Sequence, residues 1–205
     1  MALMRQNELA TYDAARFGPL PSTGIPYDRA AGAPGVRFKR TPAAVLVPLV
    51  ARPGNQAAFD VILTMRPQQM KQHAGQVAFP GGRMEPDDAS PEACALREAE
   101  EEIGLPGAAV EVLGRLDPYL TITGYEVTPV VGMIAQPVPL RPDPNEVAEV
   151  FDVPLDFLLD PANHRREQRE YNGLTRAYYA VPYGQRYIWG ATAGMILNLY
   201  ELLKD

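Results

Sequence analysis

The segment from Gly81 to Leu105 constrains this chain most, because it encodes a helix whose two ends are both marked. Ser90 suits the N-cap position, and Pro91 suits the first helical position, where a missing N–H costs nothing. Gly104 suits the left-handed residue that commonly follows the last helical turn. The segment therefore predicts a helix from about residue 91 to residue 103, preceded by a Gly-Gly turn.

Three glutamates, Glu98, Glu101 and Glu102, fall on one arc of this helix, opposite its apolar residues. Like charges at these spacings cost a few tenths of a kcal/mol per pair, and the C-terminal end of the helix dipole disfavours each anion by about 0.3–1 kcal/mol. A divalent cation such as Mg²⁺ or Mn²⁺ would offset both terms. The alternative is a solvated acidic face. The preceding Gly-Gly turn and Arg97 beside Glu98 favour the metal site.

Gly82, followed by Arg-Glu-Ala-Glu-Glu-Glu-Ile-Gly-Leu at residues 97–105, resembles the Nudix box. The core of that box reads Arg-Glu-apolar-any-Glu-Glu-any-Gly-apolar, and this chain matches it at every fixed position. The sixth residue after Gly82 is Asp88, where the box usually has glutamate, and Arg97 comes one residue late. Some members of one Nudix branch share this longer spacing.

The segment before the helix resembles the signature of coenzyme A pyrophosphatases, a branch of the Nudix hydrolases. It reads Ile-Leu-Thr-Met-Arg at 62–66 and Met-Lys-Gln-His-Ala-Gly-Gln-Val-Ala-Phe-Pro-Gly-Gly at 70–82. Lys71 stands where the signature has arginine, so the charge is kept but the two-pronged fork is lost. Residues 123–132 and 187–194 also resemble that branch.

This resemblance implies an α/β fold, an α/β/α sandwich with a mixed sheet and a loop–helix–loop metal motif. It implies hydrolysis of coenzyme A or acyl-coenzyme A at the pyrophosphate, dependent on Mg²⁺ or Mn²⁺, to 3′,5′-ADP and (acyl-)4′-phosphopantetheine. One alternative is another substrate, such as NADH, ADP-ribose or a nucleoside triphosphate. Another is a module that binds nucleotides without hydrolysis, whose mark would be loss of the glutamates.

The resemblance also implies roles for individual residues. Glu98, Glu102 and the carbonyl of Gly81 would hold the metal, with Glu101 as a further ligand or as the base that deprotonates water. Arg97 is expected to hold a glutamate in a bidentate pair rather than to contact phosphate.

Glu146 is the other candidate, beside Glu101, for the base that deprotonates water. Alternatively, Glu146 complements the dipole of a helix that starts near it. The expected substrate contacts are Arg66, Lys71, His73, Gln76 and Tyr125. His73 could equally be an ordinary loop histidine. Tyr125 could stack on adenine or pack at the rim of the core.

The chain as a whole divides into an N-terminal helix and irregular wrap over 1–36 and a hydrolase domain over 37–205. The apolar pattern predicts strands near 43–50, 60–65, 110–116, 127–134 and 178–181, and helices near 145–150, 154–159 and 188–203. Pro48 is expected to place the end of the first strand at an edge or bulge.

Composition excludes several classes of function. A net charge of −6 argues against a general nucleic-acid surface, and no apolar run is long enough to span a membrane. The single cysteine, Cys94, excludes an internal disulfide. No targeting segment is visible, so we expect a cytoplasmic protein. The resemblance implies a monomer or homodimer whose partner is a small nucleotide of the coenzyme A type.

Overall fold

The structure is a computed structural model and describes residues 40–70, 73–121, 123–171 and 174–204. The helix and wrap expected over 1–36 lie outside the described residues, and so does Lys71. The division of the chain at residue 37 stays a prediction.

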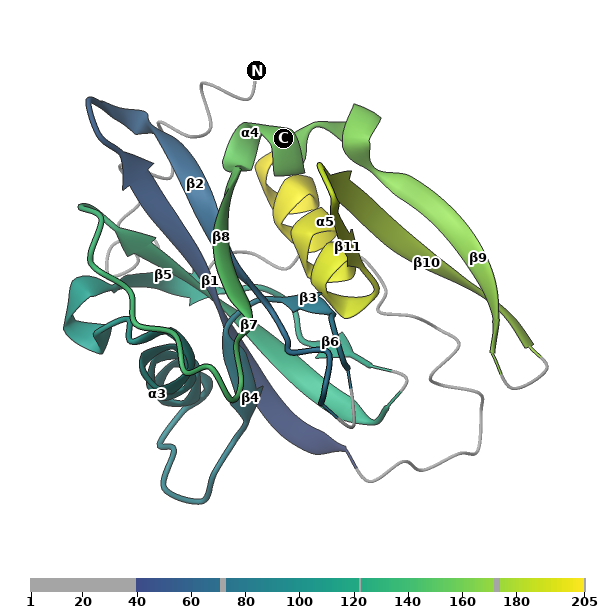
Figure 1. Cartoon of the computed structure of the whole chain (residues 1–205), viewed down its shortest axis with the longest axis horizontal. Helices are drawn as coiled ribbons and strands as arrows, with labels where there is room; N and C mark the ends of the chain where they lie inside the picture. The colour runs from purple at the N-terminus through teal and green to yellow at the C-terminus, as the bar shows by residue number, and fades with distance from the viewer. Residues whose placement is uncertain (1–39, 71–72, 122, 172–173, 205) are drawn as a thin grey trace.

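The main sheet is built around β1 (Thr41–Arg52), as Figure 1 shows. β1 pairs in parallel with β7 (Tyr125–Ile134) and antiparallel with β2 (Asn55–Met65) and β4 (Gly81–Arg83). The remaining strands are β3 (Val77–Ala78) and β8 (Glu149–Pro154), which pair with β2, and β5 (Glu111–Arg115) and β6 (Tyr119–Leu120), which pair with β7. The predicted mixed sheet is confirmed.

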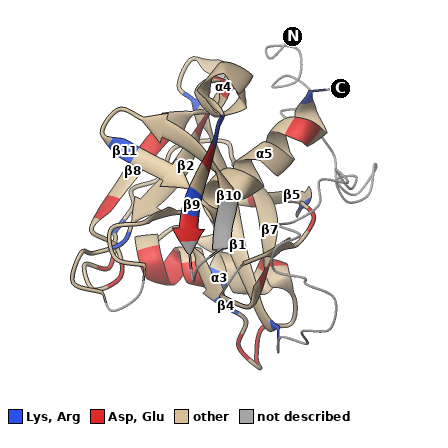
Figure 2. Ribbon diagram, turned by 90° about the vertical axis from the view of Figure 1, so that its right-hand side faces the viewer, with Lys and Arg blue, Asp and Glu red and all other residues tan. Residues whose placement is uncertain are grey.

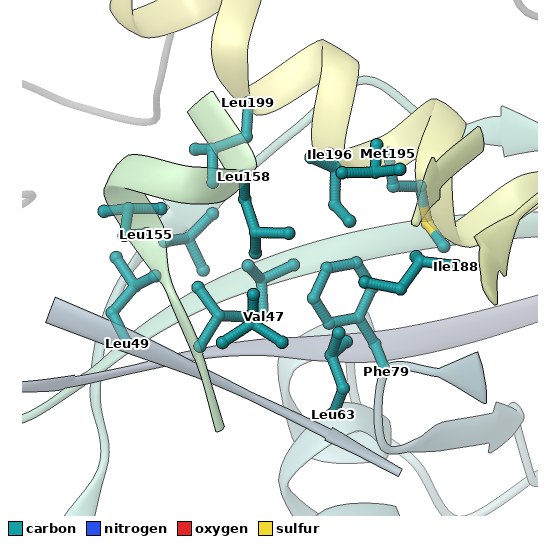
Figure 3. Packing of buried hydrophobic residues seen from close by; sticks show 14 of the residues in the cluster. Val47, Leu49, Leu63, Phe79, Leu155, Leu158, Ile188, Met195, Ile196 and Leu199 are labelled. Carbon is teal, nitrogen blue, oxygen red and sulfur yellow. The ribbon is translucent and has the colours of Figure 1, made fainter. Parts of the chain in front are cut away.

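Apolar residues on both faces of β1 are buried because helices cover the sheet on both sides. Ala44 and Leu46 face α3 (Pro91–Ile103), whereas Val47 and Leu49 face the opposite layer. That layer holds α4 (Leu155–Leu159) and α5 (Ala191–Leu203), whose leucines and isoleucines meet β1 in Figure 3. Each fully buried leucine contributes about 1.5–3 kcal/mol relative to an exposed one. The three layers form the α/β/α sandwich.

A second sheet packs beside α5 and has the order β11–β10–β9. Its strands are β9 (Arg165–Tyr171), β10 (Leu174–Tyr183) and β11 (Arg186–Trp189), all antiparallel. Val181 and Ile188 turn their side chains into the core, and the hydroxyl of Thr192 donates to the carbonyl of Val77 at 3.0 Å. The sequence pattern predicted β10 but not its two neighbours.

Three sequence predictions need correction. The helix expected from Asn145 is a turn that leads into β8, because the N–H of Ala148 bonds to the carbonyl of Met65 in β2. The closing helix begins at Ala191, since Ile188 belongs to β11. Pro48 does not end its strand: it lies between the stretch of β1 paired with β4 and the stretch paired with β2.

None of the helices in the described ranges is both long enough and apolar enough to cross a membrane.

Candidate active site

The ends of α3 form as the sequence predicts. The hydroxyl of Ser90 accepts a hydrogen bond from the N–H of Ala93 at 3.2 Å, and Pro91 occupies the first turn. Gly104 has φ of 65°, a conformation that glycine adopts without steric penalty, and its N–H bonds to the carbonyl of Glu100 at 2.9 Å. Figure 2 shows the acidic residues of α3 in red on the ribbon.

Glu102 is the most buried of the three helical glutamates, with 4% of its surface exposed. Its Oε2 accepts a hydrogen bond from the N–H of Gly81 at 3.2 Å, and its Oε1 lies 3.9 Å from Nη1 of Arg66. Burial raises the pKa of Glu102 to about 7, although Gly81 and Arg66 act in the opposite direction. A buried carboxylate with so few close partners carries an uncompensated cost.

Glu98 is half-buried one turn earlier and lies against Gly82. A Cβ at position 82 would come within 2.6 Å of the Glu98 carboxylate, so only glycine leaves room for it. Burial is the main cause that raises the pKa of Glu98, Arg97 opposes it, and the charges of Glu101 and Glu146 add to it. Both carboxylates would therefore be stabilised by a cation.

The loop after β7 packs against the end of α3. The N–H groups of Arg141 and Asp143 donate to the last carbonyls of the helix, those of Ile103 and Glu102, at 2.8 and 2.9 Å. A turn then follows, in which Asp143 accepts from the N–H groups of the next residues through its carbonyl and its side chain. This turn carries Glu146, whose charge raises the pKa of both Glu98 and Glu102.

Arg97 pairs with carboxylates on three sides. Its Nε and Nη2 donate to the two oxygens of Asp88 at 3.0 and 2.9 Å, which is a bidentate pair. Nη2 also lies 3.0 Å from Glu98, and Nη1 lies 2.9 Å from Glu101. The geometry thus agrees with a positioning role for Arg97. Asp88, at the place of the usual glutamate in the box, is its bidentate partner.

Replacing Asp88 with asparagine should lower the free energy of unfolding at pH 7 by about 1.5–3 kcal/mol, the usual worth of hydrogen bonds to a charged group. Arg97, and next the N–H of Glu85, hold the pKa of Asp88 at about 2, below its ordinary value of 3.8. The stabilisation is therefore complete above about pH 4 and lost as pH falls through about 2. Urea unfolding at several pH values measures both effects.

The matched control is Asp87→Asn, which removes the neighbouring exposed carboxylate. Equal losses in the two variants would show that the pair with Arg97 contributes nothing specific.

The donors at this site fit a hard divalent cation. Within the four described ranges, no three His, Cys, Asp or Glu side chains gather closely enough to hold a metal ion by themselves. Mg²⁺ does not require such a cage, because it usually binds one or two carboxylates together with water and substrate phosphates. Glu98 and Glu102, beside the main chain of Gly81, offer that kind of donor set.

Arg66 directly follows β2 and is the first residue of the loop that leads to β3. Its N–H donates to the carbonyl of Gln76 at 3.0 Å, and its carbonyl accepts from the N–H of Gly75 at 3.1 Å. Its Nε is buried and has no hydrogen-bond partner among the described residues. Within the loop, Nδ1 of His73 lies 2.7 Å from Oε1 of Gln76, and His73 is exposed.

The structure does not bring Tyr125 together with the glutamates. Side chains alternate between the two faces of a strand, so Tyr125 of β7 points to the same face as Val127, which packs on the α5 side of the sheet. The glutamates belong to α3, which covers the other face. With 36% of its surface exposed, it is at the rim of the core. The residues brought together are Arg66, Gly81, Arg97, Glu98, Glu101, Glu102 and Glu146.

Sequence reasoning noted Asp88 without giving it a role, and it missed Asp143. For Asp88, the signal was its place six residues after Gly82. For Asp143, the signal was the run Asp-Pro-Asn at 143–145, because an aspartate before proline and asparagine favours a turn.

Comparison with known proteins identifies the family. The model of the NUDIX domain matches residues 40–172. NudL of Escherichia coli K12, described as an uncharacterized Nudix hydrolase, is 45% identical over 157 residues, which covers 77% of this chain and 80% of NudL.

Two solved structures illustrate the likeness of the fold. The Nudix hydrolase RenU of M. smegmatis aligns with a TM-score of 0.50 and 29% identity, covering 65% of this chain and 81% of RenU. A MutT/nudix family protein of Enterococcus faecalis has a TM-score of 0.51 at 19% identity, covering 81% of this chain and 62% of that protein, a likeness of fold alone. The chain thus belongs to the Nudix hydrolases, enzymes that generally depend on a divalent metal and cleave phosphoric anhydrides, here in a nucleoside diphosphate derivative.

Proposed function

We propose that this enzyme hydrolyses the pyrophosphate bond of coenzyme A or acyl-coenzyme A, releasing 3′,5′-ADP and 4′-phosphopantetheine or its acyl form. One observation carries the proposal: both parts of the segment that resembles the coenzyme A signature reach Glu102. Nη1 of Arg66, the last residue of the first part, lies 3.9 Å from Glu102, and the N–H of Gly81, near the end of the second part, bonds to Glu102. A substrate bound by this loop would therefore have its pyrophosphate beside the carboxylates.

Glu98 and Glu102, with the carbonyl of Gly81 and with Glu101 as a further donor, would hold Mg²⁺ or Mn²⁺. A bound cation supplies charge neutralisation on the bridging phosphates and lowers the pKa of a coordinated water. The protein's own contribution is to keep the two glutamates close despite their mutual repulsion. Arg97 supports this by pairing with Glu98 and Glu101.

We assign the removal of a proton from the attacking water to Glu146. Both Glu101 and Glu146 are exposed, but Glu101 already pairs with Arg97 at 2.9 Å. Glu146 is held by the turn at Asp143, and its charge reaches both Glu98 and Glu102. A base must stand within reach of the attacking water. The turn at Asp143 places Glu146 near both Glu98 and Glu102, whereas Arg97 already engages Glu101.

Arg66 is the first candidate for contact with the substrate phosphates. Its Nε has no partner in the part of the chain that the structure describes, and its Nη1 lies 3.9 Å from Glu102, too far for a hydrogen bond. An arriving phosphate oxygen would satisfy these donors. His73 and Gln76 follow Arg66 in the same loop and are proposed as further contacts. Lys71 is proposed as another contact from its place in the signature.

A substrate panel tests the proposal. Coenzyme A, NADH, ADP-ribose and nucleoside triphosphates are each incubated with the enzyme and Mg²⁺ or Mn²⁺, and the products are identified by mass. We expect 3′,5′-ADP from coenzyme A at the highest kcat/KM, and reversible loss of activity in EDTA. Cleavage of another diphosphate with no action on coenzyme A would reject the substrate and keep the Nudix chemistry. Full activity after complete metal removal would reject the metal site.

Lys71 offers a sharper test of the substrate, because it is the main departure from the signature. Lys71→Arg should keep or raise kcat/KM, since arginine restores the two-pronged contact. Lys71→Ala should lose about 1.5–3 kcal/mol of binding, which is roughly 10- to 150-fold. Kinetics with coenzyme A and dephospho-coenzyme A measure both variants.

A larger loss for coenzyme A than for dephospho-coenzyme A would place Lys71 at the 3′-phosphate, and equal losses would place it at the pyrophosphate. If Lys71→Ala cleaves coenzyme A as well as the parent enzyme does, the contact is absent.

A further inference from the structure

The outer edge of β9 carries a charge pattern that is complementary to itself. β9 is the last strand of the second sheet and lies at the rim of the molecule in Figure 1. Among the described residues, no strand pairs with its outer edge. Its seven residues read Arg-Arg-Glu-Gln-Arg-Glu-Tyr, from Arg165 to Tyr171. We propose that this edge is a homodimer interface, in which the β9 strands of two copies pair antiparallel around Gln168.

The backbone limits which registers such a pair can adopt. The N–H of Gly190, just after β11, donates to the carbonyl of Tyr179, so Tyr179 directs its backbone groups towards β11. Successive residues of a strand direct these groups to opposite sides, and Tyr178 therefore directs its own towards Glu167 of β9. It follows that the even-numbered residues of β9, from Arg166 to Glu170, direct their N–H and C=O groups outwards.

Two outward-facing residues must lie opposite each other in a hydrogen-bonded pair, so the two-fold axis has to pass through a residue. With the axis at Gln168, Arg166 faces Glu170 of the second copy, and Glu167 faces Arg169 of the second copy. Opposite charges in directly facing positions stabilise paired strands. Every charged residue from 166 to 170 then has a partner of opposite sign.

The neighbouring registers bring like charges together. An axis at Glu167 or Arg169 places that residue opposite its own copy, and an axis at Arg166 or Glu170 does the same. Facing like charges destabilise strand pairs. Charges on an edge strand usually prevent the addition of another strand. On β9 they prevent the other registers and favour the one centred on Gln168.

Glu167 is already held in place on the outer face of this sheet. The hydroxyls of Tyr178 and Tyr187 both donate to its Oε2, at 2.8 and 2.5 Å, and they lower its pKa. Its position therefore costs little further side-chain entropy on association. Its other oxygen, Oε1, is the acceptor that we assign to Arg169 of the second copy. Tyr187, 40% exposed, extends the contact surface beside this pair.

Sedimentation of the full chain in low salt tests the interface. We expect a dissociation constant no higher than about 100 μM, as for a modest interface, so the dimer should become populated as the protein concentration approaches that value. Gln168→Pro should give a monomer, because proline removes an outward N–H and blocks pairing on that edge. The fold should persist, since the bonds from β9 to β10 use the odd-numbered residues. A monomeric parent, or a dimer that survives Gln168→Pro with an unchanged circular dichroism spectrum, would overturn the proposal.

Charge exchange tests the register itself. Arg166→Glu and Glu170→Arg should each raise the dissociation constant at least about tenfold, because each brings like charges into facing positions. Mixing the two variants should restore association as a heterodimer, in which opposite charges face each other again. Arg165→Glu is the control: it makes the same change of charge opposite Tyr171 and should have little effect. A mixture that associates no better than its components would reject this register.

Discussion

Replacing Glu102 with glutamine should lower kcat by at least about 10²-fold, the scale of a lost electrostatic contact at a reacting centre. Glutamine keeps the size of the side chain and an oxygen that can accept from the N–H of Gly81, but it loses the charge that would bind the cation. The fold should remain, because the carboxylate is buried with few partners and carries a cost of its own. Steady-state kinetics at saturating Mg²⁺ or Mn²⁺ measures the effect.

Stability without metal distinguishes this effect from a structural one. The pKa of Glu102 is raised to about 7 in the folded protein, so the folded state binds more protons than the unfolded state between about pH 4.5 and 7. From this group alone, the free energy of unfolding falls as pH rises through that window. Glu102→Gln should remove this fall, and its melting temperature in EDTA at pH 7 should equal or exceed that of the parent.

Glu100→Gln is the matched control, because Glu100 is exposed on the same helix. It should leave kcat nearly unchanged. Turnover near that of the parent in Glu102→Gln would remove Glu102 from the site.

The helix that carries these glutamates was predictable because all of its signals are local. The cap at Ser90, the glycine at 104 and the apolar stripe act within a few residues, and the structure has the helix at the predicted bounds. The pairing of Arg97 with carboxylates also follows from local crowding. Its main partner, Asp88, was less predictable because the spacing from Gly82 to Arg97 departs from the usual box.

Three features that depend on distant partners were not predictable. Residues 145–150 have a helical pattern of apolar and acidic residues. The carbonyl of Asp143 instead closes a turn, and the carbonyl of Met65 accepts from the N–H of Ala148, after which the chain pairs with β2 as β8. Pro48 reads as a strand end, yet β1 exchanges partners at that point. The approach of Glu146 to α3 results from the bonds of residues 141 and 143 to the helix carbonyls. No single segment contains that information.

Glu146→Gln should lower kcat by about 10²- to 10⁴-fold, the range expected when a general base is lost. The reason is its place on the turn at Asp143, where its charge acts on both Glu98 and Glu102. Glu101→Gln should lower kcat by less than about tenfold, because Glu101 pairs with Arg97 at the exposed side of the helix. Both variants are compared over a range of pH at saturating metal.

The pH profile decides between a base and a metal ligand. Loss of a base should leave a rate that keeps rising with pH, because hydroxide replaces the missing group, and the affinity for Mn²⁺ should stay near that of the parent. Loss of a ligand should instead weaken Mn²⁺ binding, as we expect for Glu102→Gln. If Glu101→Gln has the larger effect on kcat with metal affinity intact, the base lies on the helix, and the turn at Asp143 serves only to close the end of α3.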